Sequence, residues 1–301
     1  MKKFFKAIAD FFRPQSPSRK AFFERVVTAI KRNAQLRIGL ILLAVLLFVA
    51  FGAGLLTSRS PYYMYDDLKQ APNSTYLLGT DGLGRDVYTM IVYGTRVSLM
   101  IGIVAASISG IIGTMVGAIA GYFGGKVDRF VVEFINIFVM TPSFFLILII
   151  IALFGSSITN VMLVLGLTSW TGNARLMRAQ AISIKERVFI KSAKVIGEGN
   201  WKIMFKHVIP NGIFPVIANT TMNVSGAILS EASLSFLGLG DPNVVSWGQM
   251  ISHGKTYMSP APWISISAGI AIVFTVLTFF LLGEGLKNVL SPKLQNVQGG
   301  E

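Results

Sequence analysis

Long apolar stretches separated by short polar segments dominate the chain. A helix that crosses a bilayer core about 30 Å thick needs roughly 20 apolar residues, because its backbone must satisfy its own hydrogen bonds there. Six stretches fit, and we expect each to be a membrane helix: Ile38–Leu56, Val97–Gly121, Phe130–Phe154, Ile158–Met177, Ile213–Leu237 and Trp263–Leu282. Asn136 and Pro142 are placed to bend the third. Asn173 and Arg175 indicate that the fourth continues into water. The pattern predicts an all-α polytopic membrane protein with six transmembrane helices.

The segment before the first span has a different pattern, with apolar residues on one helical face and basic residues largely elsewhere. Two such sets occur: Phe4, Phe5, Ile8, Phe11 and Phe12, then Phe22, Phe23, Val26, Val27 and Ile30. We expect a basic amphipathic arm that lies on the lipid membrane, with packing against a neighbouring subunit as the alternative. The predicted organisation is an arm (1–37), a first helix with an outer loop (38–95), a membrane domain (96–287) containing a basic loop (180–210), and a cytoplasmic tail (288–301).

Charge sets the expected orientation. Only 14% of the 301 residues are charged and 52% are hydrophobic, whereas an average soluble domain has about 25% charged residues. The net charge of +13 is spread over blocks that apolar runs separate, so we do not expect nucleic acid as a partner. With the N-terminus inside, only Arg59, Lys69, Arg85, Arg96 and Lys255 of the 27 Lys and Arg fall outside. Cytoplasmic loops are enriched in these residues, so both termini are predicted to be cytoplasmic.

The sequence lacks the residues that several kinds of chemistry need. The chain has no Cys, which excludes a disulfide framework and a thiolate metal site. Gly125-Lys126 and Gly254-Lys255-Thr256 come near a phosphate-binding P-loop, but both lack its first Gly. The former also lacks the Ser or Thr after the Lys, and the latter falls on the predicted outer side. His207 and His253 are assigned to opposite sides of the membrane, so a shared metal site is not expected. We therefore expect no ATP hydrolysis and no cofactor in this chain.

Two features of the predicted helices leave alternatives open. Gly113, Gly117 and Gly121 lie at four-residue spacing, which favours close helix packing and also allows a flexible gating point. Glu231 lies in the outer half of an apolar helix, where an unpaired charge is costly. It either makes a structural hydrogen bond or lines a pathway through the membrane. Glu133, close to the inner end of the third helix, is expected at the interface.

The basic loop carries the most informative pattern, Lys191-Ser192-Ala193-Lys194-Val195-Ile196-Gly197 followed by His207-Val208-Ile209-Pro210-Asn211. The four-residue spacing of Ala193 and Gly197 predicts a short helix with one small-sided face. Pro210 is suited to the first turn of the fifth membrane helix. The segment resembles the "EAA" loop of binding-protein-dependent ABC importers, with Lys191 and Ser192 where Glu and Ala are usual. An ordinary basic loop is the alternative.

Two further segments narrow the resemblance. One is Gly79–Asp86 with Tyr93–Leu99 downstream, and the other is Glu231–Gly240 leading to Ser246-Trp247-Gly248. Together they resemble the C-type subunit of the peptide and nickel permease group, over about residues 78–292. Asp81, Arg85 and Asp86 either fold the outer loop through turn chemistry or contact an outer binding protein.

The resemblance implies a type I ABC importer transmembrane domain in the bacterial inner membrane. Its expected partners are a homologous B-type permease subunit, two cytoplasmic ATPase subunits that hold ATP and magnesium, and an extracytoplasmic substrate-binding protein. The ATPases would receive the coupling loop, with Lys191, Ser192, Ala193, Gly197, Val208, Ile209 and Pro210 as its candidate residues. Di- or oligopeptides are the expected substrates, with nickel or another solute as the alternative. An ion-coupled secondary transporter and a membrane enzyme are rival classes.

Overall fold

The computed structural model describes residues 30 and 32–290, so most of the expected arm and tail lies outside the described residues. Within them the regular secondary structure is helical, apart from an isolated bridge between Thr80 and Asp86, and residues 57–86 form an irregular loop. The helices in chain order are α3 (Ala34–Phe51), α4 (Ala53–Leu56), α5 (Val87–Phe123), α6 (Gly125–Met140), α7 (Ser143–Phe154), α8 (Ile158–Thr168), α9 (Trp170–Lys185), α10 (Val188–Val195), α11 (Asn200–Ile203), the π-helix η1 (Met204–Val208), α12 (Ile209–Gly212), α13 (Phe214–Phe236), α14 (Trp247–Gly254), the 3-10 helix η2 (Lys255–Tyr257) and α15 (Trp263–Leu290).

The described helices include three to five candidate membrane spans. Three of them, α3, α5 and α15, are each long and apolar enough to cross a bilayer. Two bent pairs also pass as single spans, α6 with α7 and the α11–α12 segment with α13. The expected fourth span, Ile158–Met177, is instead divided between α8 and α9. The chain is therefore all-α and membrane-spanning, but six straight helices are not what the structure shows.

The breaks between α6 and α7 and between α8 and α9 each have a cause in the residues at the break. Between α6 and α7 the axis turns by 80°, and Pro142, which cannot donate a backbone hydrogen bond, follows the last turn of α6. At the break between α8 and α9, Ser169 Oγ donates to the Leu165 carbonyl (2.6 Å). The Ser169 carbonyl accepts from Ser109 Oγ on α5 (2.9 Å). The α8–α9 break is thus held by side-chain hydrogen bonds.

The second span begins ten residues earlier than expected, at Val87 instead of Val97. Asp86 caps its first turn by accepting from the Tyr88 amide (3.2 Å). Arg96, which we had expected outside the membrane helix, lies within α5. Its guanidinium donates to the Ala50 carbonyl at the end of α3. The last carbonyls of a helix have no hydrogen-bond partner within the helix, and Arg96 supplies one here.

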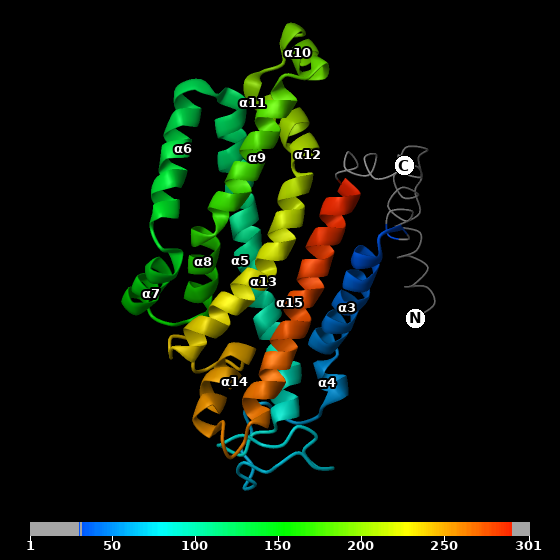
Figure 1. Cartoon of the computed structure of the whole chain (residues 1–301), viewed down its shortest axis with the longest axis vertical. Helices are drawn as coiled ribbons and strands as arrows, with labels where there is room; N and C mark the ends of the chain where they lie inside the picture. Colours follow the sequence, from blue (N-terminus) through cyan, green and yellow to red (C-terminus); the bar gives the residue numbers. More distant parts are fainter. Residues whose placement is uncertain (1–29, 31, 291–301) are drawn as a thin grey trace, which may run out of the picture.

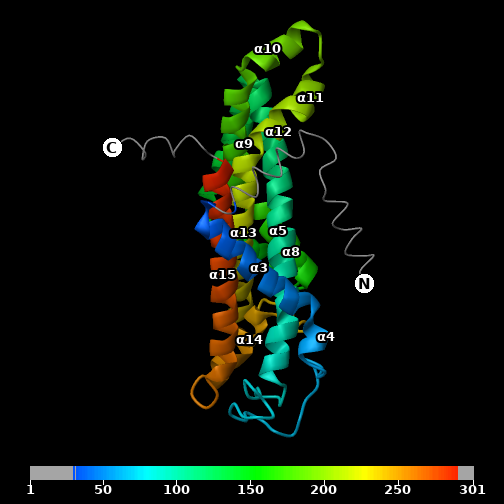
Figure 2. The same ribbon diagram turned by 90° about the vertical axis from the view of Figure 1, so that its right-hand side faces the viewer.

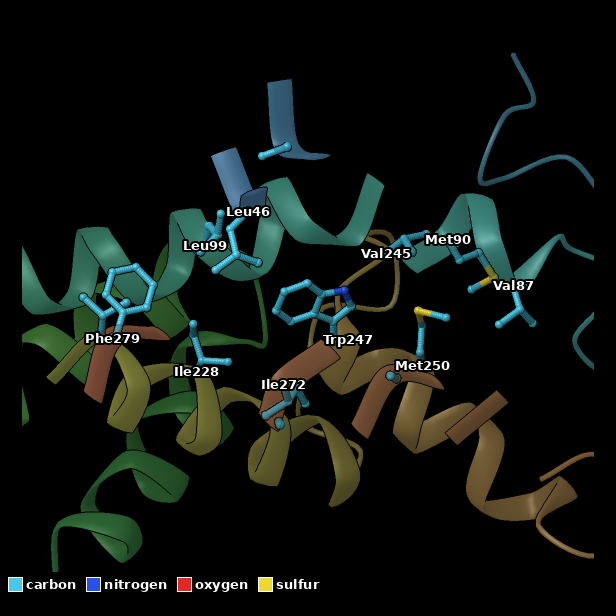
Figure 3. Packing of buried hydrophobic residues seen from close by; sticks show 14 of the residues in the cluster. Leu46, Val87, Met90, Leu99, Ile228, Val245, Trp247, Met250, Ile272 and Phe279 are labelled. Carbon is cyan, nitrogen blue, oxygen red and sulfur yellow. The ribbon is translucent and has the colours of Figure 1, made fainter. Parts of the chain in front are cut away.

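The long helices pack side by side. Helix α5 lies behind α13 in Figure 1 and next to it in Figure 2. A large apolar cluster joins α3, α5, α13, α14 and α15. Its largest member, Trp247, is only 1% exposed and donates from Nε1 to the Ile91 carbonyl (3.1 Å). Figure 3 shows the Trp247 ring next to α5, with Met250 and Ile272 nearby.

Gly113, Gly117 and Gly121 lie on the face of α5 that packs against α9, and we call this contact the glycine interface. A Cβ atom at Gly113 would lie 2.8 Å from the Trp170 carbonyl oxygen, and one at Gly121 would lie 2.5 Å from that of Arg178. At such distances only hydrogen fits, so the two backbones approach as closely as small residues permit. The glycine interface therefore makes α5 and α9 one closely packed unit.

Candidate functional site

Helix α10 forms the tip at one end of the molecule, opposite the end that carries residues 57–86 (Figures 1 and 2). Large apolar side chains lie among its outward residues, since Val188, Val195 and the following Ile196 are 79%, 88% and 81% exposed. Ala193 points the other way, into a buried cluster shared with α5, α9 and η1. Large exposed apolar side chains gathered at a tip are typical of a surface that another protein covers.

Gly197 ends α10 and does not lie on its face. The residue has φ +87, and its amide donates to the Lys194 carbonyl (3.0 Å) while the Glu198 amide donates to the Ala193 carbonyl (3.0 Å). These are the two bonds of a Schellman termination. The expectation that Ala193 and Gly197 share one helical face is therefore wrong, because the helix ends at Val195 and the turn needs a left-handed residue.

A groove of about 640 Å³ lies beside α10. Its lining comes from α10, the turn after it and η1: Val188, Phe189, Ser192, Ala193, Ile196, Glu198 and His207. Lys191 lies on the outer surface, with its Nζ 3.3 Å from Glu186, and both side chains are more than 60% exposed. The loop thus combines an apolar groove with a basic rim.

The segment after the groove connects it to the membrane helices. Val208 is fully buried at the end of η1, and Ile209 and Pro210 begin the short helix α12. A 61° bend then separates this segment from α13, which starts at Phe214. Pro210 therefore opens α12, and the expectation that it opens the fifth membrane helix itself needs this correction.

Glu198 has three basic neighbours at the edge of the groove. Its carboxylate lies 2.9 Å from His207 Nε2, 3.1 Å from Lys202 Nζ and 3.5 Å from Lys206 Nζ. Hydrogen bonds from His207 and Lys202, with the charges of the two lysines, lower the pKa of Glu198 to about 2. The sequence analysis did not single out this residue, although its place directly after Gly197, four residues before Lys202, was a usable signal.

A second surface runs along α13. Asn219, Asn223, Gly226, Ser230 and Ser233 recur at alternating spacings of four and three, which places them on one side of a helix. None of them is buried, and we call this set the polar stripe. From first to last it is about 21 Å long, at 1.5 Å per residue. Apolar length, which predicted the span Ile213–Leu237, does not reveal the stripe, whereas the periodicity of its polar residues does.

The inner end of the polar stripe is fixed to two other helices. Asn219 Nδ2 donates to Asn173 Oδ1 (2.9 Å), and Asn173 Nδ2 lies 3.1 Å from Ser109 Oγ. Asn173 and Ser109 are fully buried, so this network joins α13, α9 and α5 inside the molecule. Between α13 and α5, a groove of about 580 Å³ is instead mainly apolar, with Ile111 and Ile217 in its lining. The two accessible sides of α13 therefore differ in polarity.

Glu231 is enclosed by its own subunit. The side chain is 4% exposed and accepts hydrogen bonds from Ser235 Oγ (2.8 Å) and Ser246 Oγ (2.7 Å). A Cβ atom on Gly248 would lie 2.7 Å from its carboxylate, so that glycine makes room for the group. Glu231 lies on the buried side of α13, away from the polar stripe, and joins α13 to α14.

The outer loop is built around the three charged residues expected there. Asp81 and Asp86 are each 2% exposed. Asp81 accepts from Arg85 Nε (2.7 Å), and Asp86 pairs with Arg59 (3.1 Å). These bonds fold the loop, which is the first of the two roles considered for them. Buried carboxylates are poorly placed for direct contact with an outer protein. The loop exposes apolar side chains in their place, including Leu77 at 62%.

These features define a multi-pass membrane protein with a basic, apolar-grooved tip at one end and an ordered loop at the other. A family model described as "Binding-protein-dependent transport system inner membrane component" matches residues 113–296. The chain belongs to this family of permease subunits. Membership implies, in general terms, that it works with ATPase subunits and a substrate-binding protein, and that it is a transport subunit.

Similar proteins cover nearly the whole chain. The dipeptide transport system permease protein DppC of Alkalihalophilus pseudofirmus is 36% identical over 289 residues, which are 95% of this chain and 93% of that protein. The glutathione transport system permease protein GsiD of Pectobacterium atrosepticum is 35% identical over 270 residues, 89% of each. A solved structure of the MetNI methionine ABC transporter in an inward-facing form shares the fold, with TM-score 0.53, 17% identity, and coverage of 66% of this chain and 96% of that one.

Proposed function

We propose that this chain is one of two membrane-spanning permease subunits of an ATP-driven importer of di- or oligopeptides. It works with a homologous B-type permease subunit, two cytoplasmic ATPase subunits and an extracytoplasmic binding protein. ATP and magnesium are held by the ATPases, and this chain needs no cofactor of its own. The peptide substrate is supported by similarity to a dipeptide permease and a glutathione permease. Nickel or another solute is the alternative substrate.

The observation that carries the proposal is the tip groove and its rigid connection to the membrane helices. Val188 and Ile196 leave an apolar surface for an ATPase subunit to cover. Exposed lysines lie near it, with Lys191 on α10 and Lys202 and Lys206 beside Glu198. Behind the groove, the buried cluster of α10 and η1 packs on α5 and α9, which the glycine interface joins. Movement of the tip is therefore passed to α5 and α9 as a unit, which is the kind of two-state element that alternating access requires.

The polar stripe is proposed as this subunit's share of the passage. Amide and hydroxyl groups facing lipid tails would lose hydrogen bonds to water without replacement, so a water-filled surface suits them better. The stripe is free of charge and spans about 21 Å, most of the roughly 30 Å core. Glu231 is proposed as a structural group only, because it lies on the buried side.

The passage is tested by cysteine substitution, since the chain has no Cys of its own. Ser230→Cys in the assembled complex is expected to react with a charged methanethiosulfonate reagent and to be protected by a transported dipeptide. Ile270→Cys, on α15, is the control, because it is 65% exposed but apolar in its surroundings and is expected to stay unreactive. Equal reactivity at both positions contradicts this assignment of the stripe.

The orientation follows from the charge asymmetry. The tip with its lysines is placed in the cytoplasm, together with both termini, and residues 57–86 lie outside. The six-span topology counts the α8–α9 segment as one broken crossing. A reporter inserted near Asn73 is expected to be external, and one after Glu301 to be cytoplasmic. The proposed topology has an odd number of membrane crossings between these two positions. Reporters found on the same side of the membrane contradict it.

The importer function is tested by uptake into proteoliposomes that contain the whole complex, with the binding protein outside and ATP inside. Uptake of a labelled dipeptide is expected to require ATP and to continue when an uncoupler dissipates the ion gradient. Ile196→Asp is expected to abolish ATP hydrolysis stimulated by the loaded binding protein, because a charge enters the apolar contact. Leu77→Asp, on the outer loop, is the matched control for ATPase assembly. Uptake that fails with the uncoupler but survives without ATP favours a secondary transporter.

A further inference from the structure

The edge of the tip groove is shaped by the three basic contacts of Glu198. The Schellman turn at Gly197 reverses the chain directly after α10, and Glu198 is the first residue beyond the reversal. Lys202 follows on α11, one helical turn later. Lys206 and His207 come from the π-helix η1, whose wider turn is an unusual feature that often occurs at functional sites. One carboxylate therefore joins the turn, α11 and η1.

His207 extends this contact to α10 itself. Its ring lies edge to face with Phe189, with centroids 6.5 Å apart, while its Nε2 contacts Glu198. Phe189, Glu198 and His207 all line the groove. The distance between α10 and η1, and with it the groove width, therefore depends on a chain of contacts that begins at Glu198.

The negative charge of Glu198 also reduces the repulsion between two neighbouring lysines. Lys202 and Lys206 are one turn apart, and each is 61% exposed, so they repel each other across one face of the segment. Glu198 lies between them and compensates both. Without the carboxylate, the lysines and His207 have no anion to hold them at the groove edge, and rotation of η1 away from α10 is favoured.

We propose that Glu198 is a positioning residue for coupling, which holds His207 and η1 against α10 so that the groove has the width its ATPase partner needs. This inference rests on the proposed function of the groove. Glu198 itself makes no contact with ATP or with the transported solute in this account. Its effect is on how much peptide moves for each ATP that is hydrolysed.

The first experiment measures coupling in proteoliposomes that contain the whole complex. Glu198→Gln keeps size and one hydrogen-bond acceptor but removes the charge, and is expected to leave assembly intact while raising the ATP hydrolysed per peptide transported by about tenfold, since charge-assisted bonds are roughly twice as strong as neutral ones. Glu198→Asp is expected to recover part of the loss. Glu284→Gln on α15 is the control, because that carboxylate pairs with Lys287 (3.5 Å) outside the coupling loop and the variant is expected to couple normally.

The second experiment measures the groove directly and does not depend on activity. Spin labels on Val195→Cys and Phe205→Cys are expected to give one narrow distance distribution in the wild-type background and a broader, longer one with Glu198→Gln. Unchanged distances together with unchanged coupling overturn the role of Glu198. If the wild-type complex itself shows no ATPase stimulation by the loaded binding protein, the proposed function fails instead, whatever the labels report.

Discussion

Substitution at the centre of the glycine interface is expected to separate α5 from α9. In Gly117→Ala, the added Cβ atom would lie 2.9 Å from Met177 Cβ and closer still to the Ala174 carbonyl oxygen. Non-bonded carbon atoms prefer about 3.5–4.0 Å, so the two helices must move apart by roughly 1 Å. Overpacking of this kind typically costs about 1–3 kcal/mol.

The matched control is Gly269→Ala in α15, where no atom of the described residues outside its own helical turn lies within 4 Å of the added Cβ. Both substitutions gain about 1 kcal/mol of helix propensity, so the difference between them isolates the steric cost. The assay is thermal unfolding of the purified complex, followed by tryptophan fluorescence. At about 2–4 °C per kcal/mol, Gly117→Ala is expected to melt several degrees below Gly269→Ala. Equal melting temperatures refute the argument that close backbone contact makes α5 and α9 one unit.

The remaining predictions concern the two ends of the molecule. Gly197→Ala is expected to lower ligand-stimulated ATPase activity, because φ +87 costs a residue with a Cβ about 1–2 kcal/mol, whereas Gly199→Ala at φ −64 is expected to be tolerated. Normal activity of Gly197→Ala argues against the Schellman turn as a requirement. At the outer end, burial and the Arg85 charge hold the pKa of His253 below its ordinary value, while Asp81 acts in the opposite direction. The unfolded chain then binds the proton more readily, so stability is expected to fall as pH drops below about 6.5, and His253→Gln is expected to remove that slope in thermal melts at pH 5.5 and 7.5.

Apolar length predicted where most helices lie, since backbone hydrogen bonding in lipid leaves few alternatives to a helix. It did not predict how they break. The turn at Pro142 was anticipated as a bend, but the sequence does not give its 80° angle. The division at Ser169 depends on a hydrogen bond from Ser109 on α5, a helix distant in the sequence. The start of α5 was misplaced because Arg96 looked like a loop residue, whereas its charge is used to cap α3.

The candidate sites show a similar limit. Spacing located the loop that carries Ala193 and Gly197, but helical spacing assumes that the helix continues, and here a left-handed residue ends it. For Asp81 and Asp86 the sequence left two roles open, folding of the outer loop and contact with a binding protein, and only their burial distinguishes the two. The spacing of Glu198 and Lys202 was a usable signal for one contact, whereas the contacts with Lys206 and His207 depend on the turn at Gly197 and on the π-helix η1.

The central claim is that the α10 tip meets an ATPase subunit in the cytoplasm while residues 57–86 face the other side. The most direct measurement places a photo-crosslinking amino acid at Val195, which is 88% exposed on the tip, and separately at Leu77, which is 62% exposed on the outer loop. In cells that express the whole complex, the probe at Val195 is predicted to capture the ATPase subunit, and the probe at Leu77 never to do so. Absence of the ATPase from the Val195 products in an assembled complex, or its capture at Leu77, contradicts the account.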